Sequence, residues 1–341
     1  MNKNKVLAIT STALLLVFLT VFGIYLDLIF YSDRAAGGQS QKKLITIKRG
    51  QSFAATTQYL YREGLIKSTF RFRLLARIKG ADKRIQAGEY LLSSDLSPNK
   101  ILEAMVVGKV RLYKFTVPEG YNLKQIAEII SSAGFATQVE FLKAATDPIF
   151  VRQMNIPAET FEGYLFPDTY YFPKGASAVD LITVMVERLN SLFSDQWKKR
   201  AVETGHSIHQ VLTLASIIEK ETGAPFERPL ISSVFHNRLR KGMRLETDPT
   251  VIYGLKDFNG NLTRKDLRTP TPYNTYKIKG LPPGPIASPG LAAIEAALYP
   301  AETDYLFFVS KKDSTHHFST NFKDHERAIR KYQLRRRKKR K

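Results

Sequence analysis

An uncharged apolar run near the N-terminus is the strongest constraint on this chain: VLAITSTALLLVFLTVFGIYL, from Val6 to Leu26. A run of this length can cross the ~30 Å hydrocarbon core of a bilayer as one helix. A cleaved signal peptide is the alternative, with a weak cleavage site at AAGG from Ala35, but its apolar region is shorter, about 7–15 residues. The sequence therefore predicts a transmembrane helix over 6–26.

The charges that flank this run predict how it is oriented. Lys3 and Lys5 precede it, so the positive-inside rule places residues 1–5 in the cytoplasm. The rest of the chain would then lie outside the cytoplasmic (inner) membrane, on the periplasmic or extracytoplasmic side. Since the chain contains no cysteine, neither a lipid anchor on Cys nor a disulfide is available to it.

The formal net charge is +21, and the final RRRKKRK, from Arg335, supplies 7 of it. Basic runs can bind nucleic acid, but no base-reading motif accompanies this one, so no nucleic-acid partner is predicted. Outside the membrane a basic surface would meet anionic lipids and acidic wall polymers. The six histidines form no HExxH motif; His206 and His209 share a helical face, but no third ligand is evident, so neither metal nor cofactor is predicted.

The exported part begins with a small polar linker over 27–43. The next segment, LITIKRGQSFAATTQYLYREGLI over 44–66, predicts a strand, a glycine turn, a helix and a glycine stop. A weak repeat of it occupies 113–135, in which Gly120 matches Gly50 and Gly134 matches Gly64.

Between the two copies, helices are predicted over 70–78 and 99–107 and a strand over 87–92. Residues 44–112 therefore resemble a LysM-type module, which binds N-acetylglucosamine polymers. A plain α+β spacer fits the same pattern.

Residues 113–333 form a longer, more aromatic domain, followed by a basic tail over 334–341. We predict helices over 179–197, 207–220, 229–241 and 324–334, and a strand over 305–309. Residues 254–289 are rich in Gly, Pro, Asn and Thr, and a loop of that length is usually functional. The predicted fold class is α+β: a single N-terminal transmembrane helix, a small LysM-like α+β subdomain and a larger mixed α+β domain.

The stretch LTLASIIEKET, 212–222, contains two acids on one predicted helix. Glu219 lies beside the apolar face, a setting that favours the protonated form of a carboxyl group. Glu221 lies about 200° around the helix from that position, so the acids are not a pair, and it should meet water or Lys220. On this pattern alone, a core helix with charged surface positions is the simpler interpretation.

Four further stretches mix aromatic and polar residues: EGYLFPDTYYF (162–172), RLETDPTVIYG (244–254), TPYNTYKIKGLPPGPIASPG (271–290) and HHFSTNFKDHE (316–326). A sugar-binding groove needs such residues, because rings pack on the CH face of a pyranose and polar groups bond its hydroxyls. The same residues also make turns and strand edges.

Taken in order with LASIIEKET, these stretches closely resemble the endolytic murein transglycosylase family MltG, the YceG-like proteins, over about 44–331. The resemblance implies a membrane-anchored enzyme with a LysM-like subdomain and a catalytic domain. Its implied reaction cleaves the MurNAc-β-1,4-GlcNAc bond of nascent peptidoglycan glycan strands, leaves a 1,6-anhydroMurNAc end and terminates glycan elongation, with peptidoglycan synthases as candidate partners. The basic tail departs from the family.

The family's catalytic acid corresponds to Glu219, which would act first as general acid and then as general base. Motif position implies substrate-binding roles for Tyr164, Thr247, Asp248, Tyr253, Tyr273, Asn274, Thr275, Phe318 and Asn321. Two rivals stay open: a hydrolytic muramidase that adds a second acid such as Asp248, and a non-catalytic, membrane-tethered peptidoglycan scaffold.

Overall fold

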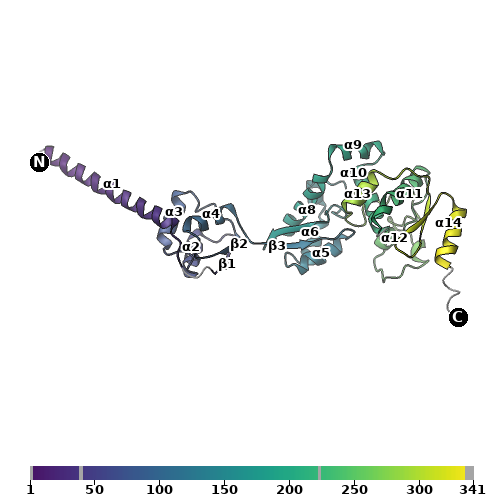
Figure 1. Cartoon of the computed structure of the whole chain (residues 1–341), viewed down its shortest axis with the longest axis horizontal. Coiled ribbons are helices and arrows are strands. Elements are labelled where there is room, and N and C mark those ends of the chain that lie inside the picture. Colours follow the sequence, from purple (N-terminus) through teal and green to yellow (C-terminus); the bar gives the residue numbers. More distant parts are fainter. Residues whose placement is uncertain (1–2, 38–40, 222–223, 335–341) are drawn as a thin grey trace. The chain divides into compact units, whose positions relative to one another are not determined.

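The computed structural model describes residues 3–37, 41–221 and 224–334 (Figure 1). The basic run from Arg335, part of the predicted linker and the first two residues lie outside these ranges. The chain divides into two compact units, which are described separately below. Unit 1 is Met1–Tyr113 with Tyr171–Gly175, and unit 2 is Lys114–Tyr170 with Ala176–Lys341.

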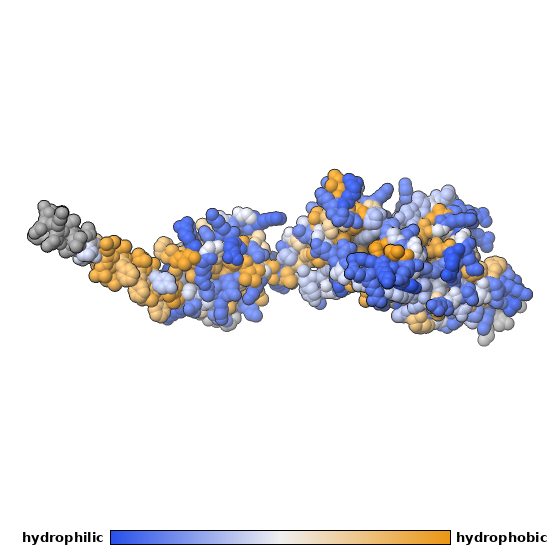
Figure 2. Space-filling view, turned by 90° about the horizontal axis from the view of Figure 1, so that it is seen from above, coloured by the Kyte–Doolittle hydropathy of each residue, from blue (hydrophilic) through white to orange (hydrophobic). Residues whose placement is uncertain are grey.

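Unit 1 begins with the long helix α1 (Lys3–Asp33). Its segment Ser11–Asp33 has a mean hydropathy of 2.5, and only 6% of that stretch is buried. Figure 2 shows the part of this helix that is not grey as a mostly apolar surface. By length and composition, α1 can cross a membrane.

The last turns of α1 are packed into unit 1. Leu28 and Tyr31 are 5% and 7% exposed and belong to its hydrophobic core. The Tyr31 hydroxyl donates to the Ser68 carbonyl at 3.0 Å, and Asp27 forms an ion pair with Arg71 at 2.9 Å. The C-terminal end of α1 is therefore part of a folded domain.

The rest of unit 1 has the predicted order of strand, helix, helix and strand: β1 (Lys43–Ile47), α2 (Phe53–Arg62), α3 (Thr69–Ile78) and β2 (Gly88–Leu92), followed by α4 (Pro98–Val107). β1 and β2 pair antiparallel, with Ile45 opposite Tyr90, and both side chains are fully buried. Serine side chains cap the N-termini of α2, α3 and α4. Whether this unit binds glycan stays a prediction.

The strands β3 (Leu112–Thr116) and β4 (Thr169–Pro173) pair with each other, and the division between the units falls within them. The helices of unit 2 are α5 (Leu123–Ser132), α6 (Gln138–Ala145), α7 (Pro148–Gln153), α8 (Ala178–Leu192), α9 (Asp195–Glu203), α10 (Ile208–Glu221), α11 (Arg228–Arg240), α12 (Asp248–Gly254), α13 (Leu291–Leu298) and α14 (Phe322–Ile329). Short 3₁₀ turns lie at Pro225–Glu227 and Asp266–Arg268, a π turn at Arg330–Leu334, and β5 (Phe307–Ser310) pairs antiparallel with β6 (His316–Ser319).

Helix α10 lies at the centre of unit 2, against α11, α12 and α13 (Figure 1). Every side chain from Val211 to Ile218 is buried. The sequence predicted one apolar face; the structure surrounds the helix on all sides, which fixes the direction of the residues that follow Ile218.

The predicted repeat is confirmed at the level of the backbone. Gly50 and Gly120 have φ of 78° and 74°, and Gly64 and Gly134 have φ of 72° and 75°. Each copy thus places glycine where a left-handed conformation is required, before and after a ten-residue helix.

Two predicted helices were wrong in extent. The helix over 179–197 is interrupted after Leu192, because the Ser194 hydroxyl accepts from the Trp197 amide and starts a new helix there. The last helix begins two residues earlier than predicted, at Phe322, where Asn321 caps it, and its final turn widens to a π turn at Arg330.

Candidate active site

Glu219 ends the buried part of α10, and its side chain is only 7% exposed. Its Oε1 lies 3.0 Å from Nη2 of Arg228, and its Oε2 accepts a hydrogen bond of 3.0 Å from the Gly290 amide. A guanidinium and a backbone N–H both stabilise a carboxylate charge. The apolar boundary predicted for Glu219 therefore needs correction, since a cation and a donor from distant segments complete it.

A second carboxylate lies beside the same arginine. Nη2 of Arg228 is 3.8 Å from Oε2 of Glu119, in the turn before α5. Burial and the charge of Glu219 raise the pKa of Glu119, and Arg228 opposes them. The side chain of Glu119 is 50% exposed, so it is in contact with solvent as well as with the buried pair of Glu219 and Arg228. Glu119 was not predicted as a site residue. It directly precedes Gly120 in the repeated glycine turn, and that turn was the only feature of the sequence that pointed to it.

Gly290 contacts both acids. Its amide donates to Glu219, and a Cβ atom at this position would overlap the carboxyl group of Glu119. Glycine at 290 thus leaves room for the Glu119 carboxyl group while its amide holds Glu219.

Glu221 was predicted to meet water or Lys220; it is partly buried and contacts α12. The hydroxyl of Thr247 donates to its Oε1, and burial raises the pKa of Glu221 to about 7. Thr275 in turn accepts from the Thr247 amide at 3.0 Å and contacts the Thr250 hydroxyl at 2.8 Å. Glu221 therefore anchors the start of α12 to α10.

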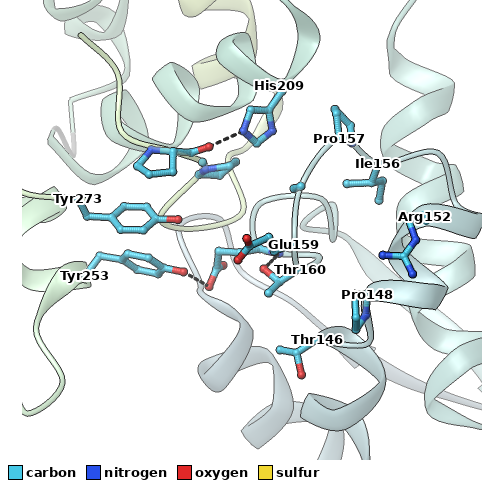
Figure 3. A pocket seen from close by; sticks show the side chains of 15 residues that line it. Thr146, Pro148, Arg152, Ile156, Pro157, Glu159, Thr160, His209, Tyr253 and Tyr273 are labelled. Carbon is cyan, nitrogen blue, oxygen red and sulfur yellow. Dashed lines mark hydrogen bonds between the residues drawn. The ribbon is translucent and has the colours of Figure 1, made fainter. Parts of the chain in front are cut away.

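Unit 2 contains a cavity of about 970 Å³ that is lined in part by Tyr253 and Tyr273 (Figure 3). Tyr253 and Tyr273 form one wall, with ring centroids 4.7 Å apart, and Arg152 lies opposite. A second cavity of about 750 Å³ shares four of its lining residues: Thr146, Thr160, Glu162 and Tyr253.

Glu219 is not among the described residues that line the two cavities. Gly120 and Lys220, which do line the second, adjoin it: a Cβ atom at Gly120 would lie 3.6 Å from Cγ of Glu219. The second cavity therefore ends close to the Glu219 side chain.

Glu162 forms part of the wall that the two cavities share. Its carboxyl group accepts from the Leu123 amide at 3.2 Å and from the Tyr253 hydroxyl at 3.2 Å. Burial raises its pKa to about 7, against these hydrogen bonds. Glu162 belongs to the EGYLF stretch, but no role was predicted for it, because a buried position cannot be recognised from a turn motif.

His209 joins two of the predicted motifs. Its Nε2 lies 2.7 Å from the Pro283 carbonyl, which can only accept, so Nε2 carries the proton. In the neutral ring Nδ1 then accepts from the Tyr164 hydroxyl, also at 2.7 Å. Tyr164 therefore positions the PPG turn at the cavity rim and is itself only 4% exposed.

The other predicted groove residues do not gather in one place. Asn274 and Thr275 are fully buried, and the Asn274 amide donates to the Leu267 and Thr269 carbonyls. Thr247 is buried as well, at 2% exposed, so the substrate-binding roles of these three residues stay predictions. Asp248 is exposed and accepts from Tyr276 at 2.7 Å.

Phe318 and Asn321 belong to the C-terminal hairpin and helix. Phe318 packs against Tyr305, with centroids 5.4 Å apart, and Asn321 caps α14. The neighbouring His316 is joined to α11 through Glu227, with Nδ1 and Oε2 2.7 Å apart. Among the residues that the structure describes, no group of three or more acids or histidines could hold a metal ion.

Comparison with known proteins gives a consistent result. A family model described as the YceG-like family matches residues 45–331. A protein of Bacillus subtilis named endolytic murein transglycosylase is 36% identical over 84% of this chain and 84% of its own length. A Streptococcus pneumoniae protein of the same name is 29% identical, over 85% of this chain and 58% of its own. The crystal structure of a putative YceG-like protein from Listeria monocytogenes superposes with a TM-score of 0.59 at 36% identity, covering 84% of this chain and 98% of that one.

Proposed function

The chain belongs to the YceG-like family, and from this membership we propose that it is an endolytic murein transglycosylase, which cuts peptidoglycan glycan strands at internal bonds. The observation that supports a catalytic centre most directly is the carboxyl group of Glu219. It is buried at the end of a core helix, is held by Arg228 and Gly290, and lies close to the second of two adjoining cavities.

The proposed chemistry uses Glu219 twice. As general acid, protonated Glu219 gives its proton to the glycosidic oxygen between N-acetylmuramic acid and N-acetylglucosamine, and the bond from that oxygen to C1 breaks. The C6 hydroxyl of the same muramyl residue then bonds to C1, and its proton passes to the Glu219 carboxylate. The product is a 1,6-anhydro sugar, and no water is consumed.

This route explains why one carboxylate is sufficient. A hydrolytic glycosidase needs a second acid as base or nucleophile, whereas here the substrate supplies the nucleophile. Arg228 lies where it can stabilise the negative charge that Glu219 carries after the first step.

We assign the two cavities to the glycan. The paired rings of Tyr253 and Tyr273 offer flat faces for sugar CH groups, and Arg152, Glu159 and Thr160 offer polar groups for hydroxyls and acetamides. Thr247, Asn274 and Thr275 support this region from within the fold. Asp248, Phe318 and Asn321 remain candidates for the outer parts of the strand.

We further propose that α1 is a single-pass anchor in the cytoplasmic membrane, with the N-terminus in the cytoplasm and both units outside. Unit 1 would bind glycan in the manner of a LysM module. Nascent strands delivered by a peptidoglycan synthase would then be the natural substrate, and the cut would end their elongation.

The deciding experiment is product analysis with the wild-type chain and Glu219→Gln on purified, uncross-linked glycan strands. The wild type should release anhydro-muramyl ends, and Glu219→Gln should be slower by about 10²–10⁴-fold. Mass spectrometry separates the rivals, because hydrolysis adds one water to each product. A hydrated product would favour the muramidase, and strand binding without any product would favour the scaffold.

Glu162 is the second candidate for the acid, because its carboxyl group lines both cavities and its pKa is raised to about 7. Glu162→Gln is therefore the matched comparison. If Glu162→Gln abolishes cleavage while Glu219→Gln retains the wild-type rate, the roles of the two residues are reversed.

A further inference from the structure

The proposed mechanism makes a demand that the Glu219–Arg228 pair alone does not meet. Glu219 must hold a proton when the glycosidic bond breaks, yet its nearest charged neighbour is a guanidinium 3.0 Å away. A cation at this distance favours the carboxylate over the acid. Some group therefore has to weaken that pair at the moment of proton uptake.

Glu119 is placed to do this. Its Oε2 is 3.8 Å from the same Nη2 atom that contacts Glu219, so one guanidinium nitrogen lies between two carboxylates. The Arg228 side chain is 11% exposed, and its Nε has no hydrogen-bond partner among the described residues. The guanidinium of Arg228 therefore keeps an N–H donor that can bind a second carboxylate.

The backbone is built around this arrangement. Gly290 gives its amide to Glu219 and leaves the space that the Glu119 carboxyl group fills. The Gly120 amide donates to the Ser288 carbonyl at 2.8 Å, which ties the turn that carries Glu119 to the segment that carries Gly290. These two main-chain hydrogen bonds hold together the segments that carry Glu119, Glu219 and Gly290.

The other charged groups nearby are engaged elsewhere. Lys220, the next residue on α10, donates to the Gly120 carbonyl at 3.2 Å, and His316 from β6 pairs with Glu227 at 2.7 Å. Arg228 at the start of α11 and Glu119 before α5 are therefore the charges that face Glu219 most directly.

We propose that Glu119 is a positioning residue, which takes over the ion pair with Arg228 when Glu219 takes up a proton. In the resting site Arg228 neutralises Glu219, and Glu119 repels its charge. When Glu219 receives a proton, from the C6 hydroxyl at the end of a cycle or from solvent, Arg228 pairs with Glu119, and Glu219 is free to point its proton at the glycosidic oxygen. This inference rests on the proposed function of Glu219.

The test is the dependence of kcat/KM on pH for the full chain in detergent, with purified glycan strands as substrate. The fall of kcat/KM at high pH, the basic limb of the profile, reports the loss of the proton from the general acid, here Glu219. Glu119→Gln removes a like charge and leaves Arg228 to Glu219 alone, so the carboxylate gains stability. The basic limb should move to lower pH by about one unit. At pH values above the limb, kcat/KM should fall roughly tenfold relative to the wild type, with little change in KM.

Two variants serve as controls. Glu119→Asp retains the charge, and its limb should return to about the wild-type position. Glu128→Gln removes an exposed acid from α5 and should leave the profile unchanged. If Glu119→Gln fails to fold, Glu119→Ser makes the same change of charge.

The outcomes separate the two proposals. An unshifted limb, or a shift to higher pH, in Glu119→Gln overturns the inference while Glu219→Gln still identifies the acid. A uniform loss of rate with an unshifted limb assigns Glu119 to substrate contact and also overturns it. If the wild type makes no anhydro product, the proposed function fails, and this inference with it.

Discussion

At the residue scale, two buried acids link the stability of unit 2 to pH. Burial raises the pKa of both Glu162 and Glu221 to about 7. In an unfolded chain a glutamate titrates near 4.3. Between these values the folded state keeps protons that the unfolded state releases, so the free energy of unfolding falls as pH rises from about 4.5 to about 7.

Glu162→Gln should remove the share of this pH dependence that belongs to Glu162. The uncharged amide retains an oxygen for the Leu123 amide, so the variant should lose less stability than the wild type on going from pH 5 to pH 8, by on the order of 2 kcal/mol. Chemical denaturation at the two pH values measures this. Glu128→Gln, at an exposed position, should show the wild-type dependence; equal slopes for all three proteins would contradict the assignment.

At the element scale, the turn that contains Gly163 is packed against the PPG turn. Gly163 has φ of 78°, and a Cβ atom there would overlap Pro285. Gly205, after α9, has a φ of 76° but nothing within 4 Å of such an atom. The two positions therefore separate the cost of a left-handed backbone from the cost of a close approach.

Gly205→Ala should lower the free energy of unfolding by about 1 kcal/mol, the cost of a left-handed alanine. Gly163→Ala should cost about 3 kcal/mol or more, because Pro285 must also move. Since Pro285 lines the larger cavity, Gly163→Ala should also slow glycan cleavage. Thermal unfolding and product release measure these effects, and equal losses of stability in the two variants would show that Pro285 gives way freely.

Local patterns predicted most of the elements. The glycine turns at Gly50 and Gly120 and the buried face of α10 were all read from spacing. The interruption at Ser194 was not, because a capping serine competes with an apolar periodicity that continues through Trp197.

The site was predictable only in part. The position of Glu219 on α10 followed from helix geometry, but its partners Arg228, Gly290 and Glu119 come from other segments. Glu221 was predicted to meet water or Lys220, and its contact with Thr247 was missed because that donor is 26 residues away. Asn274 illustrates the remaining ambiguity: an asparagine that closes a loop and one that binds sugar have the same sequence context.

At the scale of the whole molecule, α1 has two roles along its length. Residues 11–26 are mostly apolar and exposed, as a membrane span requires, and the last turns carry Leu28 and Tyr31 into the core of unit 1. The part of α1 that is free to span a membrane therefore ends near Asp27, before the end of the helix.

Two truncations test this division. The full chain should stay with membranes through high-salt and carbonate washes, whereas chains that start at Asp27 or at Arg34 should be soluble. The chain from Asp27 should unfold at the temperature of the detergent-solubilised full chain. The chain from Arg34 loses Leu28 and Tyr31 and should be less stable by about 2–5 kcal/mol. Equal unfolding temperatures for the two truncations would contradict the packing, and release of the full chain by salt alone would indicate electrostatic attachment.

The packing of Tyr31 against Ser68 also limits how this anchor can be exchanged. A foreign membrane segment fused at Arg34 would leave a hole where two side chains had been, so a chimera made there starts with a damaged domain. Fusion ahead of Asp27 keeps those side chains and their ion pair with Arg71. Helix α1 is thus not interchangeable with another apolar helix, and mutations that weaken its contacts with Ser68 and Arg71 should destabilise unit 1.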